Sequence, residues 1–432
     1  MFLVRGRGGI FILSLAFLVF LTACGLGDAS QDEVTFMVFG DPAERQAYVN
    51  LVDAFNQSHP DIRVEITHIP SPSEYRRRLA AEFAAGSPPD VTLMNYRRYA
   101  GFAAEGLLEP LDIYLEKSEK IDRDDFYPSA IEAFMWNGEL MCVPQNISSL
   151  VVYYNENLFD EAGLAYPSDD WTWDDFVNAA VALTQDFNGD GIVDQYGLGL
   201  DLSLYRLAPF LWQNDAPLVD DLFAPTRLTL TRPPSLEALQ WFVDLRQVYG
   251  VIPSRREEGA MNSESRFIAG TTAMFLNSRR GTPTYRQIEG FTWDIAPLPR
   301  NKVAAGILHS DAYCLSGAAK NKDAAWRFIE YANSVDGQRI IAASGRTVPS
   351  LIEVAESDIF LNPNQRPSRS RVWLDTIPFL RRVPVISTWQ EIEKIASEEI
   401  ERAVYGEITA DEAALLAFSR TEEYFFLGKI SP

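Results

Sequence analysis

Five segments between residues 33 and 96 constrain the fold more than any other feature of this chain. Strand-like patterns alternate with helical ones there, in the order 33–40 (strand), 42–60 (helix), 62–70 (strand), 73–90 (helix) and 90–96 (strand). We expect Ser73 to cap the second helix and Gly86 to end it. Consecutive parallel strands need a crossover connection, which a helix supplies. The pattern therefore predicts an α/β fold with mostly parallel sheets flanked by helices.

The length and charge of the chain narrow this further. A chain of 432 residues is long for one hydrophobic core, so two domains are expected. The 47% content of hydrophobic residues excludes a largely disordered chain. The formal net charge of -22 describes a surface that repels nucleic acid, so no nucleic-acid partner is expected.

The N-terminus has the pattern of an export signal. Arg5 and Arg7 precede an apolar run at 10–20, which is too short to span a membrane. The sequence Leu-Thr-Ala-Cys that ends at Cys24 resembles the lipobox of bacterial lipoproteins, in which the cysteine carries the lipid. We therefore predict a signal peptide at 1–23 and a lipidated tether (palmitate) at 24–32 that holds the protein on the outer face of a cell membrane. The alternative is an ordinary signal peptide that happens to contain a cysteine.

Two further cysteines, Cys142 and Cys314, stand in apolar strand-like contexts. They are either buried free thiols or the two halves of one disulfide.

The order of motifs along the chain resembles the family 1 extracellular solute-binding proteins of ABC importers, the group typified by maltose-type sugar-binding proteins. No single motif is diagnostic, but their order from about residue 33 to the end is. The matching segments are LVDAFNQSHPDIRVEI, AAGSPPDVTLMN, GLLEPLDIYL, NGELMCVPQNISSLVVYYNENLFDEAGL, DDWTWDDF, FIAGTTAMFLNS, NKDAAWRFIEYANSVDGQ and YGEITADEAALLA.

The resemblance implies a two-lobe periplasmic-binding-protein fold of type II, with three hinge crossings and a ligand cleft between the lobes. We expect the crossings near Val143–Ile147, Pro297–Arg300 and Thr347–Ser350, each of which contains proline. The N-terminal lobe would then comprise 33–145 and 301–348, and the C-terminal lobe 146–300 and 349–432. The implied function is capture of a carbohydrate, followed by delivery to a membrane permease through hinge closure. The protein is expected to be a monomer and to need no cofactor.

Carbohydrates are bound by aromatic platforms and by planar hydrogen-bonding groups, which parallel sheets present beyond the ends of their strands. On this argument and the family resemblance, twelve residues are candidates for ligand binding: Asp41, Glu44, Asn95, Tyr96, Asn146, Ser148, Tyr205, Trp212, Asn277, Arg279, His309 and Asp311. Arg346 and Trp373 are weaker candidates. Trp171 and Trp173 match the family's tryptophan at a helix start, so a structural role is expected for both.

Other functions remain as alternatives. The ligand could be a non-sugar solute such as glycerol phosphate or a polyamine, since the sequence leaves the charge of the cleft open. An adhesive lipoprotein and a secreted carbohydrate-active enzyme are the other two. For catalysis the signal is poor: the three histidines lack metal-ligand spacing, and no nucleophile elbow or phosphate-binding loop occurs. We expect no enzyme activity.

One loop remains to be explained. Asp186, Asn188, Asp190, Ile192 and Asp194 have the spacing of the first nine positions of a calcium-binding EF-hand loop. Position twelve, where a bidentate glutamate belongs, is Gly197. The loop is either a structural Ca²⁺ clip outside the cleft or a hairpin turn built by Asp, Asn and Gly without an ion.

Overall fold

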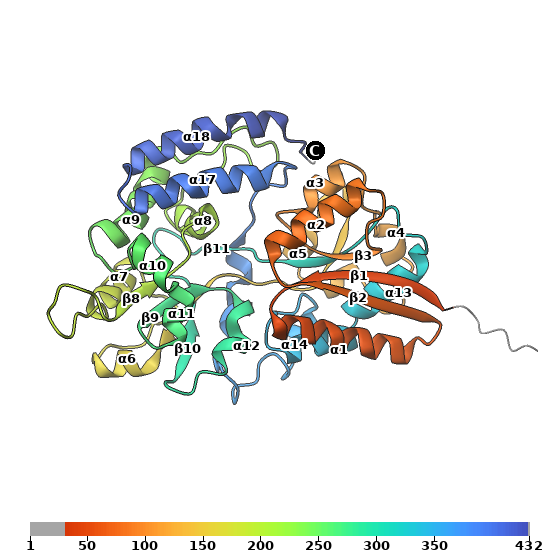
Figure 1. Ribbon diagram of the computed structural model, residues 1–432, viewed down its shortest axis with the longest axis horizontal. Coiled ribbons are helices and arrows are strands. Elements are labelled where there is room, and N and C mark those ends of the chain that lie inside the picture. Colours follow the sequence, from red (N-terminus) through yellow and green to blue (C-terminus); the bar gives the residue numbers. More distant parts are fainter. Residues whose placement is uncertain (1–30, 431–432) are drawn as a thin grey trace, which may run out of the picture.

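The computed structural model describes residues 31–430, which form two α/β lobes side by side (Figure 1). The predicted signal peptide and the predicted lipidation site Cys24 lie outside these residues. The first sheet has the strand order β2 (Ile62–Ile69), β1 (Asp32–Phe39), β3 (Val91–Asn95), β12 (Asp311–Leu315) and β6 (Cys142–Pro144). The second sheet has the order β10 (Trp293–Ala296), β7 (Val151–Asn155), β9 (Thr272–Asn277) and β8 (Tyr196–Gly199).

Helices cover both sheets. The longer helices of the first lobe are α1 (Pro42–Ser58), α2 (Pro72–Ala84), α13 (Lys322–Asn333) and α14 (Val335–Ala343). Those of the second lobe are α7 (Trp173–Ala182), α8 (Leu204–Gln213), α9 (Pro233–Gln247), α17 (Trp389–Val404) and α18 (Ala410–Leu427). Shorter helices are α3 (Tyr99–Ala104), α4 (Asp112–Leu115), α5 (Pro128–Glu132), α6 (Glu156–Glu161), α10 (Arg255–Ala260), α11 (Ser263–Ile268), α12 (Thr282–Tyr285), α15 (Ile352–Ala355) and α16 (Arg371–Thr376).

The strand and helix alternation predicted at the start of the chain is confirmed, because β2, β1 and β3 are parallel neighbours. Helix α1 begins where Asp41 accepts a hydrogen bond from the Glu44 amide at 2.9 Å. The predicted cap of α2 was wrong by two residues. Pro72 takes the first helical position, so Ser71 and not Ser73 caps the helix. Gly86 follows α2 with a φ of 69°, as its position after the helix suggested.

The sheets are mixed and not mostly parallel, which corrects one part of the prediction. Strand β12 lies between β3 and β6 and runs antiparallel to both. In the second sheet β7 is antiparallel to β10 and β9, and only β8 and β9 are parallel. The cause is the path of the chain. A segment that returns from one lobe enters the other sheet from the opposite end, without the crossover helix that parallel pairing requires.

Three segments connect the lobes and pair with one another at the centre of the molecule. The Ile147 amide donates to the Val348 carbonyl at 2.9 Å, and Ser148 and His309 exchange backbone hydrogen bonds at 2.8 Å. The first and third crossings therefore lie where the prolines suggested. The second crossing does not: Trp171 in the second lobe donates its Nε1–H to the Pro297 carbonyl, so the chain crosses ten or so residues later, near His309.

A disulfide joins Cys142 to Cys314, which settles the alternative left open by the sequence. The two cysteines face each other in the antiparallel pairing of β6 with β12, although 172 residues separate them along the chain. The first crossing segment follows β6 directly, and β12 directly follows the second. The bridge therefore holds together the first-lobe ends of two of the three connections.

Candidate functional site

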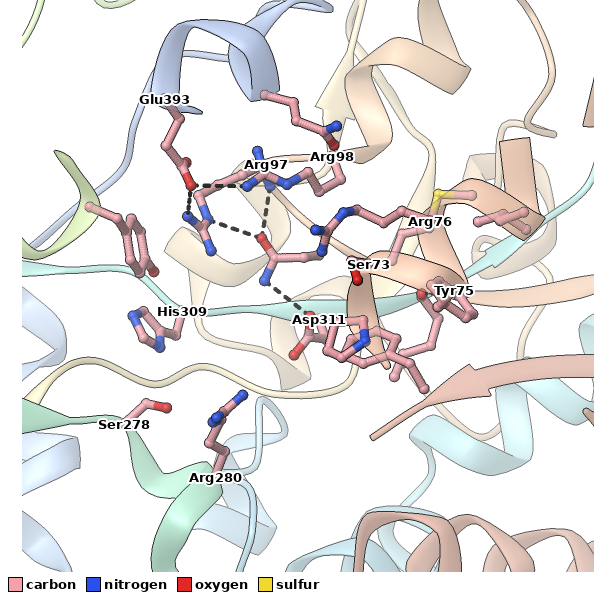
Figure 2. A pocket seen from close by; sticks show the side chains of 18 of the residues that line it. Ser73, Tyr75, Arg76, Arg97, Arg98, Ser278, Arg280, His309, Asp311 and Glu393 are labelled. Carbon is pink, nitrogen blue, oxygen red and sulfur yellow. Dashed lines mark hydrogen bonds and ion pairs between the residues drawn. The ribbon is translucent and has the colours of Figure 1, made fainter. Parts of the chain in front are cut away.

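A cavity of about 830 Å³ lies between the two lobes. Its walls come from α2 and the end of β3 in the first lobe, and from α8, the end of β9 and the start of α17 in the second, with the crossing segments as its floor. Figure 2 shows side chains from these elements pointing into the space. The volume is in the range of small-molecule sites, and clefts between lobes are where such sites commonly form.

Eight of the twelve predicted ligand-binding residues line this cleft: Glu44, Asn95, Asn146, Ser148, Tyr205, Asn277, His309 and Asp311. The weaker candidate Arg346 lines it as well. The reason is the one given by the sequence argument. Asn95 is the last residue of β3 and Asn277 the last of β9, as that reasoning expects. Asp311 is the first residue of β12 and comes to the same edge because β12 runs antiparallel to β3.

Four predicted residues do not line the cleft. Asp41 is the cap of α1 and pairs with Arg346 behind the cleft wall. Tyr96 is 1% exposed, and its hydroxyl accepts a hydrogen bond from the Val383 amide. Trp212 is buried and borders a separate cavity.

Arg279, the fourth, is 1% exposed, and its guanidinium packs over the rings of Phe360 and Trp373. Burial comes first among the causes that lower the pKa of Arg279 to about 9, followed by the charge of Arg286. Trp373, a weaker candidate, is likewise 1% exposed and packs with Arg279. Both residues belong to the core of the second lobe.

The tryptophans Trp171 and Trp173 are structural, as predicted. Trp173 donates its Nε1–H to the side chain of Gln213 at 2.7 Å and stacks on Trp241 with the ring centres 4.0 Å apart. Thr172 and Asp175 form a capping box at the start of the same helix. Neither tryptophan reaches the cleft.

On the floor of the cleft, Asn95 and Asp311 are partners across β3 and β12. Asn95 donates its Nδ2–H to the Asp311 carboxylate at 3.0 Å, and Asn146 accepts from the Asp311 amide at 3.2 Å. Burial raises the pKa of Asp311, while the hydrogen bonds from Asn95 and Asn146 act to lower it. The floor therefore presents a carboxyl group whose position is set by two amides.

Both lobes meet at Glu393 of α17. Arg97 and Arg98, which follow β3, donate to the same carboxylate oxygen at 2.7 and 2.9 Å. Burial acts to raise the pKa of Glu393, but the charges of Arg97 and Arg98 outweigh it and hold the pKa below its ordinary value. The ion pairs join the first lobe to a helix that packs on α8 and α9 of the second.

Tyr205 of α8 lies in the same corner of the cleft but offers little ring surface. The Arg97 guanidinium sits 3.6 Å from the ring centre, and the His309 ring stacks on it at 4.7 Å. Tyr205 is 6% exposed, and its hydroxyl donates to the Leu308 carbonyl. It lines the cleft without being a free platform for a sugar ring.

Several buried polar atoms at the cleft have no hydrogen-bond partner among residues 31–430. They include His309 Nε2, Arg98 Nη1 and Arg206 Nε. Burial, and then the charges of Arg206, Arg97 and Arg280, lower the pKa of His309 well below its ordinary value, so the ring is neutral. Leaving such atoms unpaired costs free energy, about 1–3 kcal/mol each, which a polar ligand would recover.

Most arginines of the cleft were not among the residues predicted from the sequence. Seven line it, of which only Arg346 was considered; the others are Arg76, Arg77, Arg97, Arg98, Arg206 and Arg280. A signal was present in the run Tyr-Arg-Arg-Arg at 75–78 and in the pair at 97–98, directly after the predicted third strand. The first run was assigned to a helix, and no function was predicted for its arginines.

The loop at 186–194 is closed by its own backbone. Asp186 accepts from the amides of Gly189 and Gly191 at 2.7 and 2.8 Å, and Asp190 accepts from Ile192 at 2.8 Å. Such hydrogen bonds are those of Asx turns. Within residues 31–430, no group of three or more His, Cys, Asp or Glu is arranged to hold a metal ion. The loop does not line the cleft.

None of the helices within residues 31–430 has both the length and the apolar character to cross a membrane.

Residues 40–339 match the family model described as bacterial extracellular solute-binding protein. A binding protein of Brucella abortus is 23% identical over 411 residues, which cover 91% of this chain and 92% of that protein. A mannitol-binding protein of Pseudomonas aeruginosa is 22% identical over 395 residues, 86% of this chain and 88% of that protein. The structure of an ABC substrate-binding protein from Listeria monocytogenes in complex with cycloalternan superposes with a TM-score of 0.83 at 24% identity, over 91% of this chain and 98% of that one.

Proposed function

The chain belongs to the bacterial extracellular solute-binding protein family, and from this premise we propose that it captures a carbohydrate in its interlobe cleft for an ABC importer. A polyhydroxylated ligand is supported by two similar proteins: one is a mannitol-binding protein, and the structure of the other is a complex with cycloalternan. The observation that carries the proposal is the cleft itself: amide, carboxyl and imidazole groups of both lobes converge on a cavity of sugar size. A solute-binding protein of this family is a receptor and not a catalyst.

Delivery to the permease would follow from closure of the lobes. The crossing segments at 145–148, 308–311 and 348–350 are hydrogen-bonded to one another, so they form a narrow pivot between two packed bodies. A ligand that contacts both lobes favours the closed state by its differential affinity for that state. A permease that recognises the closed arrangement of the lobes would thereby respond to a loaded receptor.

The lipid anchor at Cys24 and the division into lobes are part of the same proposal. A lipidated tether at 24–32 would keep the receptor next to the permease while its body stays in water. The pairing of β12 with β3 and β6 supports placing 33–145 in one lobe with the residues from about 309 to 348. Residues 301–308 go with the other lobe, because Gln213 at the end of α8 donates to the Ala305 carbonyl. The assignment of 146–300 with 349–432 to the other is supported by α17, which packs on α8 and α9.

Isothermal titration calorimetry of the full chain with a panel of mono- and oligosaccharides tests the function. We expect a saturable signal with one of them, and a loss of affinity of about tenfold or more in Asn95→Ala, which removes a side chain from the cleft floor. Asn362→Ala, an exposed site that does not line the cleft, is the matched control and should bind normally. No binding to any saccharide, or equal binding by both variants, would contradict the proposal.

The loop at 186–194 has a simple test of its own. Its side-chain oxygens already accept backbone hydrogen bonds, so we favour the ion-free turn over a structural calcium site. The melting temperature should then be the same in millimolar calcium and in chelator. A calcium-dependent rise that disappears in Asp186→Asn would restore the calcium site.

A further inference from the structure

The charge of the cleft is opposite in sign to that of the protein. The chain carries a formal net charge of -22, yet the residues lining the cleft include seven arginines and five carboxylates, and no lysine. The carboxylates are Glu44, Asp201, Asp311, Glu391 and Glu393. An excess of positive charge in the interlobe cleft of so acidic a molecule needs an explanation in terms of what the cleft binds.

Most of the carboxylates are already engaged. Glu393 binds Arg97 and Arg98, Asp201 lies 3.0 Å from Arg206, and Glu44 shares Arg346 with Asp41. Asp311 is held by two asparagines, and its pKa is raised by burial. These ion pairs engage four of the seven arginines.

Three arginines are left without a carboxylate partner among residues 31–430: Arg76 and Arg77 on α2, and Arg280 in the 3₁₀ turn Arg279–Gly281 after β9. All three side chains are exposed to the cleft. In Figure 2 Arg76 reaches into the cavity from the first lobe, while Arg280 points toward it from the second, below His309. Other arginines in the described part of the chain also lack a carboxylate partner within it, so what sets these three apart is that they surround one cavity.

The other groups around the cavity agree with an anion there. Ser73, in the first turn of α2, also lines it, so the positive end of a 13-residue helix faces the same space. Burial, and then the neighbouring charge of Arg97, lower the pKa of Arg76. The cleft also offers few exposed aromatic rings: no tryptophan lines it, the ring of Tyr205 is covered and Tyr75 is buried, which leaves the half-buried Phe39 and Phe102. Recognition by charge therefore replaces much of the stacking expected for a neutral sugar.

We propose that the ligand is an acidic saccharide, whose carboxylate or phosphate group is bound between Arg76 and Arg77 of the first lobe and Arg280 of the second. This inference rests on the proposed function and specifies its substrate class. It also excludes the polyamines that the sequence left open, because a polycation would meet the same arginines with repulsion.

The placement on two lobes would couple ligand charge to closure. Without an anion, bringing Arg76 and Arg77 closer to Arg280 raises like-charge repulsion and disfavours the closed state. An anion between them is attracted to the arginines of both lobes, and this attraction outweighs the repulsion between the arginines. A neutral sugar of the same shape contacts both lobes without that gain, so it would close the cleft less effectively.

Calorimetry with matched ligands tests the proposal on the full chain. Galactose, galacturonate and galactose 6-phosphate, together with digalacturonate and a neutral galactose disaccharide, separate the sugar from its charge and the carboxylate from the phosphate. We expect an acidic member to bind at least tenfold more tightly than its neutral counterpart. Arg280→Gln and Arg76→Gln should each weaken the acidic ligand by about 10- to 100-fold and the neutral one by less than threefold.

Arg78→Gln is the matched control. Arg78 lies on the same helix but pairs with Glu82 at the surface and does not line the cleft, so this variant should bind like the unmodified chain. Melting curves of all three variants check that they fold, which is expected because Arg76 and Arg280 are exposed and unpaired.

The failures of the two proposals are distinguishable. Neutral saccharides that bind as tightly as acidic ones, or glutamine variants that weaken both equally, would overturn the acidic ligand and leave the carbohydrate receptor intact. Binding of glycerol phosphate without any saccharide, or no binding at all, would overturn the proposed function and this inference with it.

Discussion

Arg346 pairs with two carboxylates whose pKa values are shifted in opposite directions. Its guanidinium pairs with both Asp41 and Glu44 at the first turn of α1. Asp41 is partly exposed; burial acts to raise its pKa, but the charge of Arg346 and the backbone hydrogen bond from Glu44 lower it below the ordinary value. Burial raises the pKa of Glu44 to about 7, against the opposing charge of Arg346. One positive charge thus compensates Asp41, and Glu44 takes up a proton near neutral pH.

The linkage between this proton and folding predicts a pH dependence. Because the pKa of Glu44 is about 7 when folded, against 4.5 for a free glutamate, the folded state holds the proton more tightly. Stability from Glu44 is therefore full below about pH 4.5 and is lost as the pH rises toward 7 and above. Relative to Glu44→Gln, the free energy of unfolding of the unmodified chain should fall by on the order of 3 kcal/mol from pH 4.5 to pH 8.

Urea unfolding of both proteins at intervals of one pH unit measures this difference. Asp41→Asn is a useful companion, since it removes a competitor for Arg346 and should lower the pH at which the difference develops. A stability gap between the unmodified chain and Glu44→Gln that does not change across this range would show that Glu44 is ionised in the fold.

At the scale of elements, α17 is the helix that reaches both lobes. It packs with α18 on α8 and α9, and these two long helices extend across the top of the second lobe in Figure 1. Glu393, in its second turn, meets Arg97 and Arg98 from the loop after β3. All three side chains are less than 20% exposed. Such a buried triad is costly to break, because removing one partner leaves charge without compensation.

We therefore predict that Glu393→Gln lowers the free energy of unfolding by about 3 kcal/mol, as measured by urea denaturation. The matched control is Glu398→Gln on the same helix, whose side chain is 45% exposed and lies 3.3 Å from Arg420 and 4.0 Å from Lys394; because these pairs are at the surface, its effect should stay below about 1 kcal/mol. Because the triad joins the lobes, Glu393→Gln should also increase the radius of gyration in X-ray scattering without ligand. Equal stability of the two variants would mean that the triad contributes no more than a surface pair.

Elements also show where sequence reasoning succeeds and where it stops. The parallel β2, β1 and β3 followed from helical and strand spacing, because these contacts are local along the chain. The antiparallel insertion of β12 could not be derived that way, since its partners lie more than 160 residues away. Likewise, the positions of Asn95, Asn277 and Asp311 near predicted strand ends were enough to place them at the cleft. Arg76 and Arg280 could not be placed there from the sequence, because this requires knowing which face of α2 points to the cleft and how close the two lobes lie.

For the whole molecule, the disulfide between Cys142 and Cys314 is a covalent link between segments 172 residues apart. Closing a loop of this length restricts the unfolded chain strongly, so its loss should lower the free energy of unfolding by about 2–5 kcal/mol. The double variant Cys142→Ser/Cys314→Ser and the reduced unmodified chain should show this loss equally in urea. Two free thiols titrated in the denatured, unreduced protein would contradict the bridge.

The position of β12, the strand that carries Cys314, has a consequence for the order in which the protein folds. Strand β12 sits in the interior of the first sheet, between β3 and β6, yet it follows every strand of the second sheet along the chain. A chain that emerges from its N-terminus must therefore hold an incomplete first lobe, with the edges of β3 and β6 unpaired, until residue 315 has appeared. Maturation of this receptor is not sequential by lobe: the sheet that begins first is completed only after all the strands of the other sheet have been made.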